Sequence, residues 1–429
     1  MARSIKQNII LSFTIFSLIS IVIVGAISVL VIGMIGQTTV GESTNALEEQ
    51  IQRNMEKSAE QNAKVINQKL SDAENMVEMM AEECEMIFSD DNTYQWRRSY
   101  YDYFFQYDQD QAPAGILPSN TYKITLDGTE QSLWVSWNYA SYYFPGSTQT
   151  NYDQYAEQYN DTLGKVSNMD YIFSYIHENA PDFRWLYVVF GAPGTSLDGL
   201  FINYPGSIVG GSSTERVSTP FEPTGEEWYA EVLAGNGNIV FTAPYFDPID
   251  GVLLITIGRA IYYPNGTAIG IIAGDLSIES VKDKILDVVI LESGYAALIQ
   301  EDGTVVAHQD YDPPEPEEIT DDTVLPGIND VEVNKDKTPV LTAADVQAIT
   351  SGNSGLIEYT RDKEQRFLAY HPVGKGDYIC LIVVPVSEAI AAVKPLQDRI
   401  GLTTLATIAQ VVIIIAATGI ISVLAGFFT

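Results

Sequence analysis

The sequence predicts an α+β fold in which a long N-terminal helix is followed by two antiparallel-sheet modules, with a transmembrane helix on either side. Three observations lead to this prediction: an uncharged apolar run near each end, a helical apolar pattern after the first run, and many strand-like segments separated by Gly- and Pro-containing turns. The chain has 429 residues, of which 46% are hydrophobic. This length and composition allow at least two cores and exclude a mainly disordered protein.

The two apolar runs, residues 9–36 and 401–428, contain no charged side chain and exceed the roughly 20 residues that span a bilayer. A cleaved signal peptide is the alternative for the first run, but its apolar part is longer than the ~7 to 15 residues typical of such segments. Arg3 and Lys6 precede this run and favour a cytoplasmic segment 1–8. We therefore expect a two-pass protein of the cell membrane with residues 37–400 outside the cell.

The segment between the runs is strongly acidic. All 56 Asp and Glu residues lie there, with all but two of the 23 Lys and Arg residues, which leaves a formal charge of −35. Such a field disfavours nucleic acid and anionic lipid surfaces and concentrates cations, including protonated amines. A solvated surface adapted to a salty or acidic exterior explains the charge equally well.

The outer segment divides into a helix and two modules. Apolar residues recur at helical spacing from Leu47 to Ile87, so we expect a long amphipathic helix within residues 37–110. Its apolar stripe fits either a homodimer seam or packing on its own domain. Strand patterns then predict a membrane-distal module at 111–290 and a smaller membrane-proximal module at 291–390. Aromatic residues crowd positions 94–144, which fits either packing of an irregular segment or a contact platform.

Catalytic and metal-binding motifs do not occur. The three histidines lack zinc-ligand spacing, and the chain contains no GxSxG, Walker A or DxDxDG sequence. We therefore expect neither an enzyme nor a metal or other cofactor. A continuous helix would carry Cys84 roughly 70 Å from the membrane, whereas Cys380 lies shortly before the second apolar run. Two separate buried thiols are expected instead of a disulfide.

Acidic residues lie beside aromatic or apolar residues in three short segments: FEPTGEEWY at 221–229, APYFD at 243–247 and IIAGDLS at 271–277. The carboxylate of Asp275, at the end of an apolar run, either caps the following helix or faces a cavity where it meets a cation. Glu226 either belongs to a site or points to solvent, and Glu227 needs no role beyond solvation. The candidate ligand-binding residues are Phe221, Glu226, Trp228, Tyr229, Tyr245, Asp247 and Asp275.

The order of these segments resembles the double Cache ectodomain of bacterial and archaeal chemoreceptors and sensor kinases. The signature is an aromatic-acid-Pro sequence, then Trp-Tyr, then PYxD, then a strand that ends in Gly-Asp. The segment GYAALIQEDGTVVAHQD at 294–310 is similar to the strand-turn-strand with His-x-Asp of the family's second module. The resemblance covers nearly all of residues 40–400. It implies two PAS-like modules between two spans, the distal one binding a ligand.

The resemblance also implies roles for the candidate residues. In amino-acid-binding members, the Tyr and Asp of PYxD and the later Asp hold the ligand ammonium, and these are Tyr245, Asp247 and Asp275 here. A Tyr, an Arg and a Trp of an aromatic-DPxxR-x-WY segment hold the ligand carboxylate in the same members. Trp228 is retained here, with Tyr229 beside it.

The carboxylate side of the family's site departs from the pattern in this chain. Phe221 replaces the Tyr and Glu226 replaces the Arg. A Glu in place of the Arg would repel a carboxylate by more than about 1 kcal/mol in a partly buried site. Acids inside aromatic walls favour a cation instead, through Coulomb attraction and cation–π contact. The substitution therefore predicts an amine as the ligand, with an α-amino acid disfavoured.

Two functions follow as hypotheses. The first is a transmembrane sensory receptor that binds a small amine outside the cell and passes a conformational signal across the membrane, as a homodimer. The second is an accessory or structural membrane protein that uses the Cache scaffold to bind a partner, with 94–144 as the contact surface. The chain ends at Phe427-Phe428-Thr429 without a cytoplasmic signalling segment. A truncated receptor and signalling through another membrane or cytoplasmic subunit both fit this ending.

Overall fold

The structure is a computed structural model. It describes residues 49–89, 93–97, 99–101, 116–126, 129–145, 152–180, 182–191, 199–209, 222–247, 252–278, 292–314 and 323–391, with four helical positions at 406, 409, 410 and 413. Both expected membrane spans otherwise lie outside these residues. Within the residues described, no helix combines the length and apolar character needed to cross a membrane.

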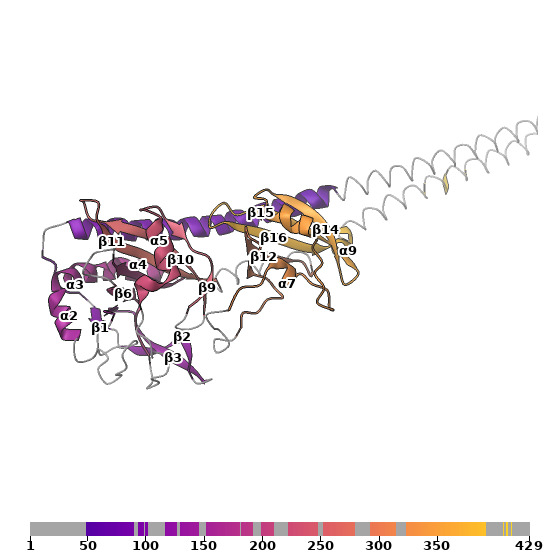
Figure 1. The fold of residues 1–429 in the computed structure, drawn as a ribbon. Coiled ribbons are helices and arrows are strands. Elements are labelled where there is room, and N and C mark those ends of the chain that lie inside the picture. Colours follow the sequence, from indigo (N-terminus) through magenta and orange to yellow (C-terminus); the bar gives the residue numbers. More distant parts are fainter. Residues whose placement is uncertain are drawn as a thin grey trace, which may run out of the picture.

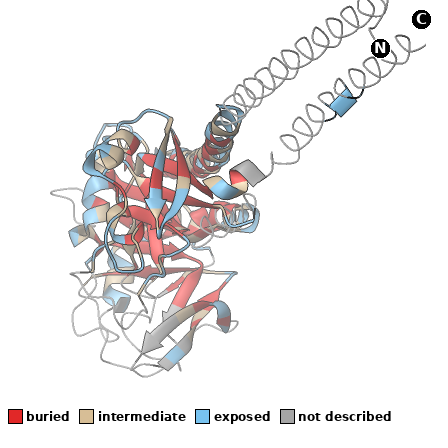
Figure 2. Cartoon of the chain, turned by 90° about the vertical axis from the view of Figure 1, so that its right-hand side faces the viewer, coloured by how far each residue is buried: buried red, intermediate tan, exposed pale blue. Residues whose placement is uncertain are grey.

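A long helix, described over residues 49–89, runs along the whole molecule and contacts both modules (Figure 1). Its apolar stripe is buried against them, which resolves the sequence ambiguity in favour of packing on its own domain. Figure 2 shows buried residues in the sheets and along one side of this helix. The buried stripe comprises Met55, Ala59, Ala63, Ile66, Leu70, Ala73, Val77, Met80, Ala81, Cys84, Ile87 and Phe88.

The helix is described up to residue 89, and residues 93–97 are not helical, so it is shorter than the expected limit of 110. The sequence that follows, Asp90-Asp91-Asn92, consists of residues that favour caps and turns over helix interiors. A short strand already begins at Ser99. The aromatic residues that follow Ser99 therefore belong partly to a sheet.

The first module is built on a large sheet. Within the described residues, eight strands form it in the order β1-β4-β6-β5-β11-β10-β8, with β9 paired to β10. All neighbours are antiparallel except β1 and β4. The strands are β1 (Ser99–Tyr101), β4 (Ala140–Tyr143), β5 (Phe183–Phe190), β6 (Phe201–Tyr204), β8 (Val240–Phe241), β9 (Tyr245–Phe246), β10 (Leu253–Tyr262) and β11 (Ala268–Ser277).

A smaller sheet and several helices complete the first module. The described strands of this sheet run in the order β2 (Leu117–Leu126), β3 (Thr129–Ser136) and β7 (Gly206–Val209), and they lie on the side away from the long helix (Figure 1). The helical segments are α2 (Tyr152–Gln158), α3 (Asn160–Val166), η3 (Ser167–Met169), α4 (Asp170–Asn179), η4 (Pro223–Gly225) and α5 (Glu227–Ala234).

The second module contains one antiparallel sheet, formed by five of the described strands in the order β13-β12-β16-β15-β14. The strands are β12 (Tyr295–Gln300), β13 (Val305–Ala307), β14 (Gly355–Arg361), β15 (Glu364–Pro372) and β16 (Tyr378–Pro385). Helices α7 (Ile328–Val331), α8 (Ala343–Ile349) and α9 (Val386–Ala391) accompany them.

Each large sheet has one face toward the long helix and one face away from it. In the first module, Leu186 and Val188 of β5 belong to the core around the helix, whereas Trp185 and Tyr187 belong to a separate core on the opposite face. The second module divides in the same way, with Ala296 facing the helix side. Alternation along a strand sends successive side chains to opposite faces.

The two cysteines are buried thiols in separate places. Cys84 lies in the long helix and Cys380 lies in β16. Burial raises the pKa of the Cys380 thiol to about 12 and that of Cys84 well above its usual range. Neither is a reactive thiolate at neutral pH.

Candidate functional site

The face of the first module's sheet away from the helix carries a polar cluster. We call Trp185, Tyr187, Tyr245, Asp247, Thr256 and Asp275 the first-module cluster. Its centre is the Asp275 carboxylate, whose Oδ1 accepts hydrogen bonds from the Tyr187 hydroxyl at 2.8 Å and from Thr256 Oγ1 at 2.7 Å. Asp275 is only 6% exposed. It lies inside strand β11, opposite Thr256 and Trp185, and it faces this cluster.

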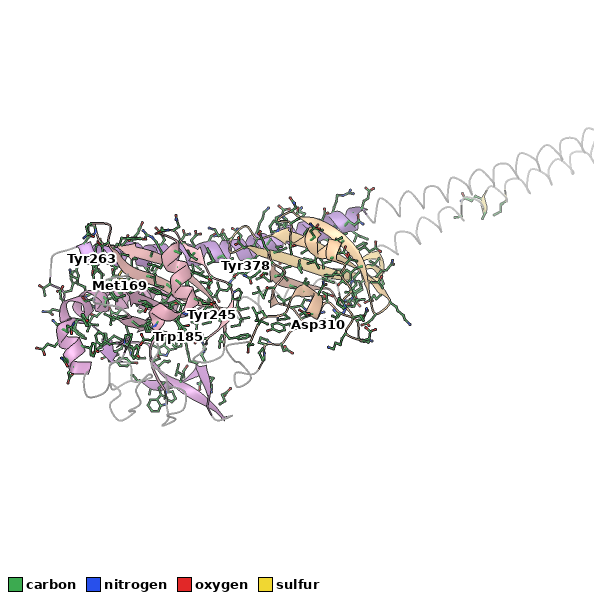
Figure 3. All side chains as sticks on the ribbon, in the orientation of Figure 1. Met169, Trp185, Tyr245, Tyr263, Asp310 and Tyr378 are labelled. Atoms are coloured by element: carbon green, nitrogen blue, oxygen red, sulfur yellow. The ribbon has the colours of Figure 1, made fainter. Side chains whose placement is uncertain are left out.

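Asp247 is a second buried carboxylate, 5% exposed, and it follows directly after strand β9. Its Oδ2 accepts a hydrogen bond from Trp185 Nε1 at 3.2 Å. Figure 3 shows Trp185 and Tyr245 lying close together in the first module. The Tyr245 hydroxyl lies 2.8 Å from Thr256 Oγ1, and this contact joins β9 to the centre of the cluster.

Three carboxylates act on the Tyr245 phenol. Burial is the largest cause that raises its pKa well above the usual range, followed by the charge of Asp275 and then those of Asp247 and Glu226. The pKa of Tyr187 is raised likewise, by burial and by Asp275. The region is therefore strongly negative and half-enclosed, and both phenols stay protonated as hydrogen-bond donors near neutral pH.

Helix α5 brings two aromatic rings to the cluster. The Trp228 ring meets the Tyr187 ring edge-on, with centroids 5.4 Å apart. Tyr229 is buried and its hydroxyl donates to the Gly191 carbonyl. The helix can approach β10 because Gly258 has no side chain: a Cβ there would come within 2.8 Å of the Val232 methyl groups. Glycine at 258 thus allows α5, the helix that carries Trp228, to pack closely on the sheet.

The predicted site residues fall into three groups. Tyr245, Asp247 and Asp275 lie in the cluster, and Trp228, Tyr229 and Glu226 border it from the start of α5. Glu226 is half-buried, whereas Glu227 is exposed. Phe221 lies outside the described residues.

Sequence reasoning missed Trp185, Tyr187 and Thr256. The first two alternate in FRWLYVVF, and Thr256 is a polar residue in the apolar run LLITIGRAIY of β10. A polar residue within an otherwise apolar buried strand is a signal that could have identified Thr256.

A guanidinium group also lies near the cluster. Asp275 pairs with Trp185 and Leu276 pairs with Phe183, so Arg184 is the extra residue of a β-bulge. Its guanidinium carbon lies 4.4 Å from the Tyr122 ring centroid and 5.9 Å from that of Trp185. It thus lies over the Tyr122 ring and, at a longer distance, over the indole that donates to Asp247. No sequence motif indicated this placement.

Strand β10 connects the cluster to the long helix. Thr256 faces the cluster, while Arg259, three residues later, reaches the helix on the other face. The Arg259 guanidinium pairs with Glu78 at 3.2 Å and Glu85 at 3.4 Å, and its Nε donates to the Gly237 carbonyl at 3.0 Å. A movement of β10 would therefore be transmitted to the long helix through these ion pairs.

The chemistry available in the cluster is recognition of a cation. Carboxylates attract a positive charge in a region of reduced dielectric, and aromatic faces stabilise it further. Within the described part of the chain, no three His, Cys, Asp or Glu residues are grouped so as to hold a metal ion.

The curated proteins to which this chain is similar include methyl-accepting chemotaxis proteins. The curated methyl-accepting chemotaxis protein PctB of Pseudomonas aeruginosa is 27% identical over 206 residues, which are 47% of this chain and 29% of that protein. McpB of Bacillus subtilis is 28% identical over 97 residues, 23% of this chain and 14% of McpB. The matched segments thus cover less than a third of these relatives.

Solved structures with a similar arrangement include two chemoreceptor ligand-binding domains. That of Campylobacter jejuni Tlp3 in complex with L-norvaline has a TM-score of 0.40 and 13% identity, covering 80% of this chain and 93% of that one. That of P. aeruginosa PctB in complex with L-Arg has a TM-score of 0.34 and 21% identity, covering 51% and 72%. The Cache domain family model matches residues 43–393. This match extends over most of the chain, from the long helix to the end of the second sheet, and the chain therefore belongs to the Cache domain family.

Proposed function

We propose that this chain is a transmembrane sensory receptor whose first Cache module binds a small extracellular amine. The observation that carries the proposal is that the buried carboxylates of Asp275 and Asp247 lie in one hydrogen-bonded cluster with Tyr245 and its aromatic neighbours, with Glu226 at its border. A ligand ammonium placed among these groups would gain charge-assisted hydrogen bonds from the carboxylates and a cation–π contact with the Trp228 or Tyr187 ring. The role that we propose for the first module is ligand binding, without catalysis.

The proposed signal is a shift between two arrangements of the first module. Binding can drive such a shift only if the two arrangements differ in affinity for the amine. An ammonium drawn between Asp275 and Asp247 would pull β11 and the end of β9 together, with β10 between them in the hydrogen-bond network. The Arg259 ion pairs would carry this movement to the long helix. We further propose that two copies act as a homodimer in the cell membrane, with residues 37–400 outside.

Arg184 supports a second candidate, an amino-acid receptor. PctB and Tlp3 ligand-binding domains were solved with amino acids, and a guanidinium near Trp185 offers a partner for a ligand carboxylate. In such a site the ammonium would lie near Asp275 and the carboxylate near Arg184. The two candidates differ in what removal of Arg184 does.

The test is a binding panel on the full chain in detergent or nanodiscs. Isothermal titration would compare monoamines, diamines and a quaternary ammonium with α-amino acids at one ionic strength. We expect amines to bind and amino acids to bind at least about tenfold more weakly, since repulsion from Glu226 exceeds about 1.4 kcal/mol. Glu226→Arg should weaken amine binding and improve amino-acid binding.

Matched variants separate the candidates. Arg184→Met should leave amine affinity unchanged, and Glu227→Gln is the control for Glu226 because its side chain is exposed one residue away. Tight amino-acid binding that is lost in Arg184→Met would replace the amine with the amino-acid proposal. Binding of neither class would favour the accessory role, with a protein partner in place of a small ligand.

A further inference from the structure

The second module contains its own buried polar cluster, which the proposed ligand site does not use. We call Tyr295, His308, Asp310, Glu332, Tyr359 and Arg361 the second-module cluster. Its centre is the Glu332 carboxylate, and both Glu332 and His308 are 0% exposed. Asp310, labelled in Figure 3, marks its edge. A carboxylate enclosed so completely is costly unless donors surround it.

Four side chains donate to Glu332, two to each oxygen. Oε1 accepts from the Tyr295 hydroxyl and lies 3.1 Å from His308 Nε2. Oε2 accepts from the Tyr359 hydroxyl at 3.1 Å and from Arg361 Nη1 at 3.3 Å. The donors come from β12, the end of β13 and β14, whereas Glu332 comes from the segment after α7 that covers the sheet.

In the hydrogen bond between His308 and Glu332, the donor can be identified. The backbone N–H of Asp310 donates to His308 Nδ1 at 3.0 Å, so Nδ1 carries a lone pair. The proton of this neutral imidazole must then be on Nε2, which donates to Glu332. Arg361 is itself fixed by Asp310, whose Oδ2 lies 2.7 Å from Nη2. Asp310 thus orients two of the four donors.

Without Glu332, these donors would form a receptor for a small carboxylate. An arginine, a neutral histidine and two phenols would point at one position, and the acid that fills it, Glu332, belongs to the same chain. The position is also the counterpart of the ligand site proposed above: Tyr295 and Tyr359 lie in the core on the sheet face away from the long helix. Trp185 and Tyr187 lie on the corresponding face of the first module.

We propose that the second module has a carboxylate-binding site and that Glu332 occupies it as a tethered ligand. The side chain joins the covering segment, α7 with residues 332–340, to the sheet in the way a bound carboxylate would. Backbone hydrogen bonds hold Glu332 in register: its N–H donates to the Ile328 carbonyl at 2.8 Å and its carbonyl accepts from Val340 at 3.1 Å. The second module is therefore held in its liganded form without a free ligand.

The test is chemical rescue in the full chain. Glu332→Ala removes CH₂COO⁻ and Glu332→Gly removes one further carbon, so acetate matches the first gap and propionate the second. We expect both variants to melt at lower temperature than wild type. Acetate should raise the melting temperature of Glu332→Ala more than propionate does, and the order should reverse in Glu332→Gly. A site with a Kd of about 1 mM favours the folded state roughly 100-fold at about 100 mM ligand.

Four controls make the result decisive. Sodium chloride at equal concentration accounts for ionic strength, and wild type should not respond to either carboxylate because its site is full. Glu332→Gln should be destabilised yet unresponsive, since the amide fills the space. Adding Arg361→Met to Glu332→Ala should abolish the rescue. Equal responses in wild type and variants, the same rank order in both variants, or a Glu332→Ala protein unfolded with and without acetate would each overturn the proposal.

Discussion

At the residue scale, Asp275 shows how one carboxylate is prepared for a cation. Two hydroxyl groups, from Tyr187 and Thr256, donate to the same oxygen and hold the side chain in place. Such preorganisation means that a ligand does not have to order the acid when it binds. The carboxylate is thereby oriented toward the cluster.

Asp275→Asn is the sharpest test of this charge. The amide oxygen can still accept from Tyr187 and Thr256, so we expect stability to change by less than about 1 kcal/mol. Amine affinity should fall at least about tenfold, because a buried charge-assisted contact is lost. Titration calorimetry with the best amine of the panel measures this. An unchanged Kd would place the ammonium elsewhere.

Residue identity also shows how far sequence reasoning reaches. Tyr245, Asp247 and Asp275 were named from short segments of acids beside aromatic rings and apolar strands, and they lie in one cluster, whereas ligand binding by them stays a prediction. Arg184 could not be found, because only the β-bulge opposite Asp275 and Leu276 determines its direction. A one-residue register shift moves a side chain to the other face of a sheet.

At the element scale, strand β10 is joined to the long helix by ion pairs and a hydrogen bond. Arg259 is 15% exposed and holds Glu78 and Glu85, which lie seven residues apart on the helix. Glu85 Oε1 also accepts from the backbone N–H of Tyr262 at 2.9 Å. The strand is therefore attached to the helix at two positions along its length.

Arg259→Met should uncouple these elements. We expect a loss of about 1 to 3 kcal/mol in the free energy of unfolding, since the charged hydrogen bonds of the largely buried Arg259 guanidinium to Gly237 and to the partly exposed Glu78 and Glu85 are lost. Thermal or urea unfolding measures it. Arg53→Met is the matched control: Arg53 and Glu49 form an exposed pair on the same helix, worth at most about 0.5 kcal/mol.

The same variant tests the proposed signal path. Arg259 lies on the sheet face opposite the first-module cluster, so amine affinity should change little. A variant that binds the amine normally but no longer changes helix mobility on binding would support transmission through β10. Spin labels on the exposed Val65 and Met79 positions report that mobility. Normal ligand-induced mobility changes in Arg259→Met would argue against this path.

At the scale of the whole molecule, the formal charge of −33 and the buried Glu332 respond to acid in opposite directions. Protonation of exposed carboxylates relieves repulsion across the surface. Protonation of Glu332 removes interactions that only the folded state has. Burial acts to raise the pKa of Glu332, but the hydrogen bonds from His308 and the Tyr295 hydroxyl and the charge of Arg361 outweigh it, and the pKa is lowered.

The sign of the pH dependence follows from this lowered pKa. The stabilisation by Glu332 is complete above the unfolded pKa of about 4.3 and is lost as pH falls through the lower folded value. We expect the difference in melting temperature between wild type and Glu332→Gln to be large at neutral pH and to shrink below about pH 4. Subtraction cancels the surface effect, which both proteins share. A difference that grows on acidification would contradict the assignment.

The sequence by itself determined the α+β class, the long amphipathic helix, the two successive sheet regions and three acids of the candidate site. Periodicity and local composition encode these features directly, since they depend on neighbours along the chain. Only the tertiary structure decided that the helix stripe packs on both modules, that Trp185, Tyr187 and Thr256 join Asp275, and that Glu332 fills the second module. These contacts join residues far apart in sequence, and their geometry depends on strand order, register and one β-bulge.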